Sequence, residues 1–414
     1  MASGERGRHR EGSIGAGDGS IGDLGEFGLI AAIAARMRPG PGTVVGIGDD
    51  AAVLAAPDGR VVATTDFLLE GRHFRRDWAG PSDIGHRAAA RSLTDVAAMG
   101  AVATALLVAF AAPPGLPASW ALDLTSGLAA ECERAGASVA GGDVARSDVI
   151  LLAVTGLGDL QGRDPVTRSG ARPGDVVAAA GPLGRSAAGL ALLAAGFPAR
   201  PAPGSAPGAA PGSVAGPVAG SVARAVAGLI AAHLRPAPPY DAGPEAAALG
   251  ATAMIDVSDG LLADLGHIAE ASGVAIDVRT AALDTAALEP AARALAAADP
   301  GASAPGASAS AASPSAVSGP AVSGPASSGR ADRTLDAAGP EPSRHAGGAV
   351  PGDQHATALN WALTGGEDHS LVATFPPGVP LPARWAEIGV VREGRGVLVD
   401  GRPHPGAPGW DHFR

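Results

Sequence analysis

Short apolar segments alternate with longer segments of helical periodicity along most of this chain, and this alternation restricts the fold more than any other feature. The segments with the length and apolar content of buried strands include residues 44–47, 61–66, 102–110, 138–140, 176–180 and 253–257. Residues 84–99 and 118–135 have the length and spacing of helices. The order of these segments predicts an α/β or α+β fold.

The chain has 414 residues, which is long enough for two domains. We expect a disordered tail at residues 1–23, an N-terminal domain at 24–160 and a C-terminal domain at 161–414. Residues 197–220 and 300–351 are dominated by Pro, Gly, Ala and Ser, so they cannot bury enough apolar surface to offset the entropy lost on ordering. We predict that both segments are flexible insertions in the C-terminal domain.

Composition excludes several classes of function. The thirty basic residues are all arginine, so sites that need a lysine, such as a Walker A motif or a Schiff base, are ruled out. A formal net charge of −11 disfavours nucleic-acid binding. The single cysteine, Cys132, forms no intramolecular disulfide, and no segment resembles a signal peptide or a membrane span. We therefore expect a cytoplasmic protein that does not bind membranes.

Aspartates lie near the ends of predicted strands and helices: Asp49, Asp50, Asp66, Asp95, Asp143, Asp256 and Asp259. Most have a local explanation, because Asp forms turns and Ser258 fits the N-cap of a helix that begins at Leu261. Asp95 is different, because it lies in an otherwise apolar helix, where an unpaired carboxylate is costly. A divalent cation would offset that cost, and carboxylates beside Thr hydroxyls are oxygen ligands that suit Mg²⁺ and its phosphates.

Two glycine pairs, Gly141-Gly142 and Gly365-Gly366, precede acidic residues. Such pairs let the backbone approach a phosphate closely, although tight turns alone would explain them. Arg168 is equally compatible with a surface charge and with a clamp on ATP phosphates.

Ten blocks, in the same order, resemble thiamine-monophosphate kinases. They include GIGDDAAVL (46–54), TTDFLLEGRHF (64–74), SLTDVAAMGA (92–101), TRSGARPGD (167–175), IDVSDGLLADLGHIAEASG (255–273) and TGGED (364–368). The resemblance implies the fold shared with aminoimidazole-ribonucleotide synthetase, which has two α/β domains. It also implies an N-terminal domain that pairs across a homodimer, and a cleft between the domains that holds ATP and several Mg²⁺ ions.

The resemblance implies a role for each matching residue. The implied magnesium ligands are Asp50, Thr64, Thr65, Asp66, Asp95, Asp143, Asp256 and Asp259. The implied ATP contacts are Gly142, Asp143, Arg168 and Ser258. The implied contacts to thiamine monophosphate are His73, Glu367 and Trp410.

The implied activity is that of a phosphotransferase, which converts thiamine monophosphate to thiamine diphosphate with release of ADP. The acceptor phosphate is largely ionised at neutral pH, so direct in-line transfer needs no general base and no catalytic side chain beyond those that position metal and phosphate. The chain departs from the family pattern at Ser92, which replaces Asn, and at His369 and Ser370, which replace Tyr and an acidic residue. The alternatives are another synthetase of the same superfamily and a non-catalytic regulator that binds nucleotide or thiamine phosphate.

Overall fold

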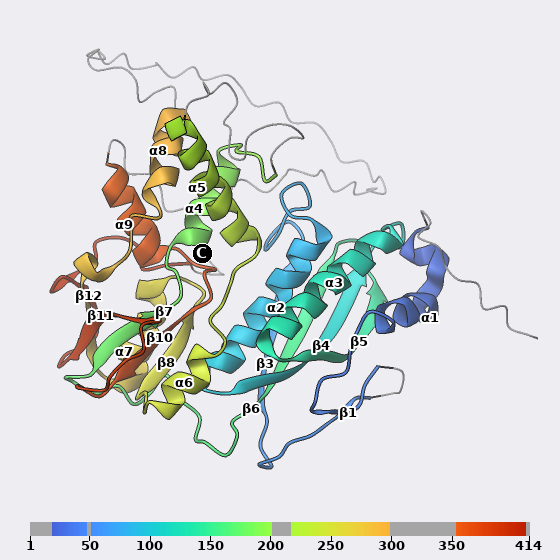
Figure 1. The fold of residues 1–414 in the computed structure, drawn as a ribbon, viewed down its shortest axis with the longest axis horizontal. Coiled ribbons are helices and arrows are strands. Elements are labelled where there is room, and N and C mark those ends of the chain that lie inside the picture. The colour runs from blue at the N-terminus through green and yellow to red at the C-terminus, as the bar shows by residue number, and fades with distance from the viewer. Residues whose placement is uncertain (1–18, 48–50, 201–216, 299–352, 411–414) are drawn as a thin grey trace, which may run out of the picture.

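The computed structural model describes residues 19–47, 51–200, 217–298 and 353–410. Figure 1 shows two bodies side by side, one formed by the N-terminal part of the chain and one by the C-terminal part. Each body combines helices with a sheet, which confirms the predicted mixed fold class.

A four-stranded sheet of order β3-β6-β4-β5 forms the N-terminal body. Its strands are β3 (Val62–Leu69), β4 (Val102–Ala112), β5 (Ser138–Arg146) and β6 (Leu151–Asp159). The other elements here are α1 (Ile21–Ala34), β1 (Thr43–Val45), β2 (Val53–Leu54), α2 (Pro81–Ala98) and α3 (Ala118–Ala135). Helices α2 and α3 cover one face of the sheet (Figure 1). They approach each other so closely that a Cβ on Gly127 would lie 2.1 Å from the carbonyl oxygen of Ser82.

The other face of this sheet is open. Along β3, side chains point to alternate faces, and burial alternates accordingly. Leu68 is fully buried towards the helices, whereas Phe67 is 56% exposed on the open face. Thr64 and Asp66 therefore face α2, and Thr65 faces the open side.

A seven-stranded sheet of order β13-β12-β9-β11-β7-β10-β8 forms the C-terminal body. Its strands are β7 (Val176–Ala180), β8 (Ala253–Val257), β9 (Ala275–Val278), β10 (Ser370–Phe375), β11 (Trp385–Arg392), β12 (Gly396–Val399) and β13 (Arg402–Pro403). The helices are α4 (Arg185–Ala194), α5 (Pro217–Leu234), α6 (Ala242–Ala248), α7 (Leu261–Ser272), α8 (Glu289–Ala298) and α9 (Gln354–Thr364), with a short 3-10 helix, η1, at Thr280–Ala282. Helices α4, α5, α8 and α9 cluster at one end of the body (Figure 1).

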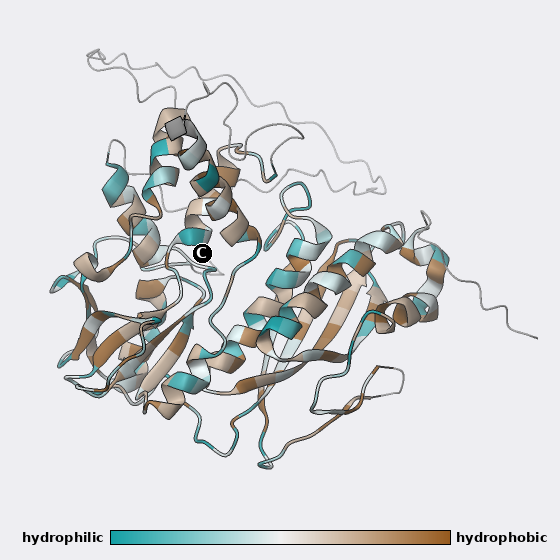
Figure 2. Cartoon of the chain, in the orientation of Figure 1, coloured by the Kyte–Doolittle hydropathy of each residue, from teal (hydrophilic) through white to brown (hydrophobic). Residues whose placement is uncertain are grey.

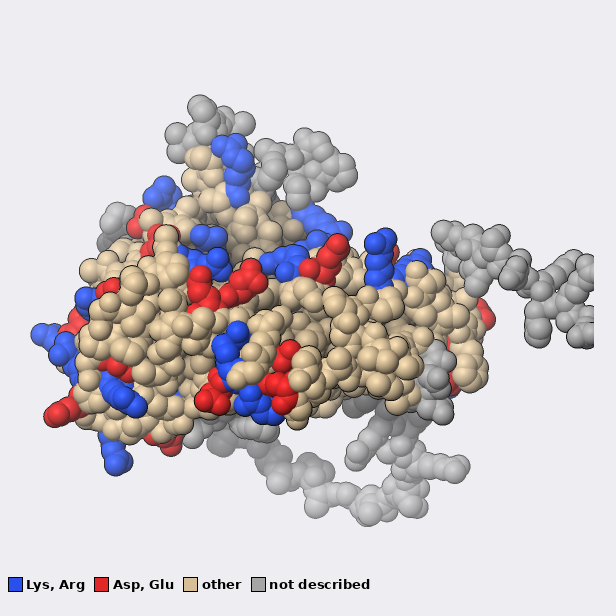
Figure 3. All heavy atoms as spheres, turned by 60° about the horizontal axis from the view of Figure 1, so that its bottom comes forward, with Lys and Arg blue, Asp and Glu red and all other residues tan. Residues whose placement is uncertain are grey.

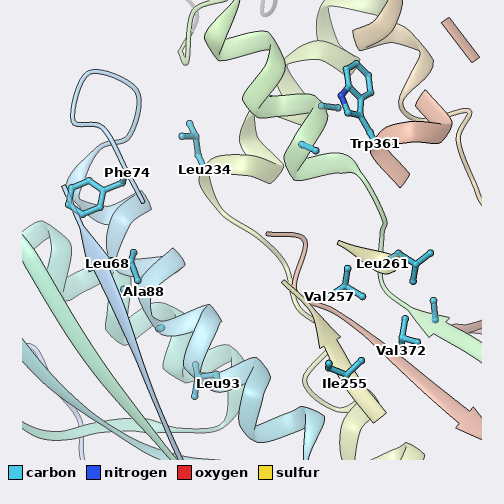
Figure 4. Close-up of a cluster of buried hydrophobic side chains, with 14 of the residues drawn as sticks. Leu68, Phe74, Ala88, Leu93, Leu234, Ile255, Val257, Leu261, Trp361 and Val372 are labelled. Atoms are coloured by element: carbon cyan, nitrogen blue, oxygen red, sulfur yellow. The ribbon is translucent and has the colours of Figure 1, made fainter. Parts of the chain in front are cut away.

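The apolar core continues across the boundary between the two bodies. Figure 4 shows Leu68 of β3 and Leu93 of α2 on one side of this boundary, and Ile255 of β8 and Val372 of β10 on the other. Hydrophobic residues are concentrated in the strands of both sheets (Figure 2). None of the helices within the described ranges is long and apolar enough to cross a membrane.

The structure corrects the predicted limits of two segments. Helix α1 begins at Ile21, with Ser20 as its N-cap, so the end of the predicted tail belongs to the fold. Phe197 is buried and α5 begins at Pro217, so both edges of the predicted insertion at 197–220 also belong to the fold. The predicted insertion at 300–351 lies outside the described residues.

The limits of two strands also differ from expectation. Strand β5 does not end at Ala140 but continues to Arg146, so Asp143 lies within the strand. Strand β3 likewise continues past Asp66 to Leu69. Gly141 and Gly142 favour a turn locally, but both pair with the parallel strand β4, and this pairing keeps them in β5.

Candidate functional site

Acidic side chains from both bodies meet at the boundary between them. Asp66 of β3 and Asp95 of α2 come from the N-terminal body, and Asp256 of β8 comes from the C-terminal body. Burial, followed by the charges of Asp256 and Asp66, raises the pKa of Asp95 to about 7. Contacts join the carboxylates of the two bodies in one site: Arg91 lies 3.6 Å from Asp66 and pairs with Glu367, and His369 lies 3.7 Å from Glu367 and 3.5 Å from Asp256.

Hydroxyl groups orient two of these carboxylates. Thr64 donates a hydrogen bond of 2.7 Å from Oγ1 to Asp95 Oδ2. Ser92 donates a hydrogen bond of 2.9 Å from Oγ to Asp66 Oδ2, although it departs from the family's usual Asn. The cluster is therefore rich in oxygen atoms with defined positions.

Two arginines of α2 reach across the boundary to Glu367, in the turn between α9 and β10. Arg87 Nη2 lies 2.8 Å from Glu367 Oε2, and Arg91 Nη1 lies 2.6 Å from Glu367 Oε1. Arg91 also lies 3.6 Å from Asp66. Burial raises the pKa of Glu367, but the charges of Arg91 and Arg87 outweigh burial and hold that pKa well below its usual value. Glu367 is therefore ionised at neutral pH.

The turn that carries Glu367 has an unusual backbone. Glu367 and His369 have φ angles of 66° and 53°, in the left-handed region that residues other than glycine rarely occupy. Backbone hydrogen bonds from Glu367 N to Ser258 O (2.8 Å) and from His369 N to Val257 O (2.9 Å) hold the turn against the end of β8. Such conformations persist where surrounding contacts determine them, and they are concentrated at functional sites.

His369 is the buried cation of this turn. Its Nδ1 lies 3.5 Å from Asp256 Oδ2, and its Nε2 lies 3.7 Å from Glu367 Oε2. Burial lowers the pKa of His369, but the two carboxylates outweigh burial and raise it to about 9. The imidazolium form therefore balances the charge of Asp256.

The turn after β8 brings the predicted Ser258, Asp259 and Trp410 together. Trp410 N donates a hydrogen bond of 2.9 Å to Asp259 O. We expected Ser258 to be the N-cap of α7, but Gly260 occupies that position. The Asp264 carboxylate instead accepts the backbone N–H groups of residues 258, 259 and 260, at 3.0 to 3.1 Å.

Other predicted residues lie away from this cluster. Thr65 and Asp143 face the open side of the N-terminal sheet, and Gly142 and Asp143 line a cavity of about 820 Å³ beside α1 and α3. Arg168 lies near the start of β8, where its carbonyl accepts a hydrogen bond from Ser272, whereas Asp256 lies near the end of that strand. His73 follows β3, and its Nδ1 accepts a hydrogen bond from Leu69 N.

Asp50 lies outside the described residues. Within the described ranges, no three His, Cys, Asp or Glu side chains are arranged to hold one metal ion. Mg²⁺ is commonly held by only one or two carboxylates together with waters and phosphates. The pair Asp66 and Asp95, with the hydroxyl of Thr64, fits that chemistry.

Sequence reasoning missed Arg87, Arg91 and the roles of Ser92 and His369. A signal for the arginines was present, because residues 87, 91 and 95 are spaced by four and share one helix face. On the face of the molecule shown in Figure 3, acidic and basic side chains are interspersed between large uncharged areas.

Comparisons with known proteins are consistent with one another. Residues 48–160 match the family described as AIR synthase related protein, N-terminal domain. A thiamine-monophosphate kinase of Mycobacterium tuberculosis is 41% identical over 398 residues, which are 94% of this chain and 92% of that protein. A thiamine-monophosphate kinase structure from Stenotrophomonas maltophilia is 28% identical with a TM-score of 0.60, and covers 90% of this chain and 96% of its own. A structure of AaThiL complexed with AMPPCP and TMP is 29% identical with a TM-score of 0.62. The match covers 94% of this chain and 98% of the AaThiL chain.

Proposed function

The chain belongs to the thiamine-monophosphate kinase family, and on that premise we propose that it transfers the γ-phosphoryl group of ATP to thiamine monophosphate. The products are thiamine diphosphate and ADP. The observation that carries this proposal is a site of acidic side chains at the boundary: Arg91 contacts Asp66 of one body and Glu367 of the other, and His369 contacts Glu367 and Asp256.

The physical problem of this reaction is the repulsion between two polyanionic substrates. The chemistry that Mg²⁺ supplies when bound is neutralisation of this charge and alignment of the phosphate oxygens. Asp66, Asp95 and Asp256 would hold the ions, with Thr64 and Asp259 beside them. Ser92 and Thr64 keep two of the carboxylates in fixed orientations.

The acceptor oxygen needs no general base, because the second pKa of a phosphate monoester is about 6. Catalysis by this chain is therefore a matter of position and charge. This agrees with the contacts of the boundary site, where arginines and hydroxyl groups hold the carboxylates in place.

Glu367, Trp410 and His73 are our proposed contacts to thiamine monophosphate. Glu367 and Trp410 both contact the turn after β8, through Ser258 and Asp259 respectively. The Glu367 side chain keeps 27% of its surface exposed, so a ligand can reach it. The proposed ATP contacts are Gly142, Asp143, Arg168 and Ser258.

We further propose that the chain acts as a cytoplasmic homodimer whose N-terminal sheets pair through their open faces. Phe67 and Val61, which are 56% and 55% exposed, would be covered in such a pair. Thr65 and Asp143 face the same side, so pairing would enclose these two proposed magnesium ligands and Gly142.

Incubation of the protein with ATP, Mg²⁺ and thiamine monophosphate tests the reaction. We expect thiamine diphosphate and ADP in equal amounts, and no thiamine diphosphate when Mg²⁺ is chelated or when thiamine replaces its monophosphate. Release of ADP without thiamine diphosphate would support another synthetase of the superfamily, and tight nucleotide binding without any turnover would support the regulator.

A further inference from the structure

A ring of polar contacts closes on itself behind Glu367. Arg87 donates to Glu367 and, through Nη1, to His233 Nε2 at 3.4 Å. His233 Nδ1 lies 3.0 Å from Ser186 Oγ, and Ser186 N donates to Asp368 Oδ1 at 2.8 Å. Asp368 is the neighbour of Glu367 in sequence, so the five residues form one closed path, which we call the polar ring.

Four of the five residues of the polar ring are buried, and they come from four separate elements. Ser186 is 1% exposed, Asp368 4%, His233 6% and Arg87 7%. These residues lie on α4, the Glu367 turn, α5 and α2 respectively. Buried polar groups that are all hydrogen-bonded favour one arrangement of their elements over others, because any other arrangement leaves a group unpaired.

The hydrogen-bond donors of the ring are fixed by chemistry. Arginine only donates, so His233 Nε2 accepts, and the proton of this imidazole therefore lies on Nδ1 and is donated to Ser186 Oγ. Burial and the charge of Arg87 lower the pKa of His233 to about 3, so the His233 imidazole is neutral at physiological pH. Arg87 Nη1 consequently donates to an acceptor, His233 Nε2, whose protonation does not change near neutral pH.

Glu367 is held on both of its oxygens. Arg87 binds Oε2, and Arg91 binds Oε1. The backbone of Glu367 is in the left-handed region, at a φ of 66°, where only surrounding contacts keep a residue of this type. The arginines are the side-chain contacts from the other body that supply this restraint.

We propose that Arg87, held by His233 and Ser186, is a positioning residue that fixes Glu367 for binding of thiamine monophosphate, and that Arg91 shares this role. The inference rests on the proposed function, in which Glu367 contacts the acceptor. Arg87 and Arg91 act on the acceptor contact, so their loss should weaken binding of thiamine monophosphate and leave binding of ATP unchanged.

The variant Arg87→Gln tests the proposal, because Arg91 still pairs with Glu367 and supports the fold. We expect the KM for thiamine monophosphate to rise by about tenfold or more, as for loss of a charge-assisted hydrogen bond, with the KM for ATP unchanged. Calorimetric titration with thiamine monophosphate in the presence of AMPPCP, which excludes turnover, should show the same loss. Arg87→Lys should recover part of the affinity, because it restores the charge but not the planar fork.

His233→Phe is the second variant, because His233 contacts no substrate in this scheme. It should raise the KM for thiamine monophosphate in the same direction as Arg87→Gln, and it decides the question if Arg87→Gln does not fold. Arg392→Gln is the matched control, since it removes an ion pair of 2.8 Å with Asp277 between β11 and β9 and should leave both KM values unchanged.

Two results would overturn the proposal. One is a lower thermal midpoint in Arg87→Gln and His233→Phe with unchanged affinity for thiamine monophosphate, which would make the ring purely structural. The other is an equal rise in the KM values for both substrates. The wild-type protein is assayed in parallel, and if it forms no thiamine diphosphate, the proposed function itself has failed.

Discussion

Thr64 on β3 donates a hydrogen bond of 2.7 Å to Asp95 on α2, and this contact fixes one oxygen of a carboxylate that is buried near two others. Burial, followed by the charges of Asp256 and Asp66, raises the pKa of Asp95 to about 7, so the ionised form of this carboxylate is costly in the free protein. A group that destabilises the free protein in this way is typical of a binding site. The predictions below follow from this and from the contacts around it.

Asp95→Asn should abolish turnover and leave the fold intact. We expect kcat/KM to fall by at least about a hundredfold, the upper range for groups that only support a metal ligand. The thermal midpoint near pH 8 should stay the same or rise, because the change removes repulsion with Asp66 and Asp256. Activity assays over a range of Mg²⁺ concentrations and thermal unfolding measure both effects, and near-normal activity at saturating Mg²⁺ would contradict the assigned role.

Asp83→Asn should weaken the boundary between the bodies without changing either KM. Asp83 is buried and forms ion pairs with Arg235, which directly follows α5, and, at 2.9 Å, with Arg200. Loss of charge-assisted hydrogen bonds costs about 1–3 kcal/mol, which lowers the thermal midpoint by about 1–5 °C in a chain of this size. Asp77→Asn is the control, since Asp77 is largely exposed and its ion pair with Arg75 should contribute little.

The metal-free protein should become less stable as the pH rises from about 6 to 9. The pKa of Asp95 and of Asp368 is raised from 3.8 to about 7, so the folded state keeps protons that the unfolded state has already lost, and the decline from these two groups ends near pH 7. The pKa of His369 is raised from 6.5 to about 9, so its contribution is complete below 6.5 and is lost towards 9. Thermal unfolding in chelator at constant ionic strength measures this trend, and a midpoint that rises with pH would contradict it.

Replacement of residues 300–351 by a short Gly/Ser linker should preserve activity. Helices α8 and α9, which flank this segment, already contact each other through Arg293 Nε and Gln354 Oε1 at 3.4 Å. The end of α8 lies roughly 8 Å further along the helix, a distance that a linker of about ten residues spans. Circular dichroism and the kinase assay check the result, and failure to fold would show that the segment is structural.

Much of the fold could be predicted from local patterns. The β-branched and apolar runs identified strands such as β7 and β8 correctly, because these are buried on both faces and carry no competing signal. Strand β5 was predicted too short, because Gly141 and Gly142 favour a turn locally and only the parallel pairing with β4 overrides that preference.

The candidate site was predicted less completely. Asp95 was identified because a carboxylate in an apolar helix needs a partner, and the structure places two other aspartates beside it. Ser186 and His233 begin two of the ten blocks that resemble the family, at 186–193 and 233–236, but no role for either side chain followed, because their significance depends on contacts between elements far apart in sequence. Successive side chains of a strand point to opposite faces, so the Thr65 side chain lies on the other face of β3 from Thr64 and Asp66. All three residues were predicted to be magnesium ligands without regard to this rule.

Arg87 and Glu367 are 280 positions apart in the chain, and their contact joins two bodies that each have a sheet of their own. Contacts of such long sequence separation form late in folding, because the loop between them must first be closed. During refolding, secondary structure should therefore return before the affinity for the acceptor does. A newly made chain can acquire this affinity only after Glu367 and the strand that follows it, β10, have been synthesised, so a chain that stops before this point cannot sequester the substrate.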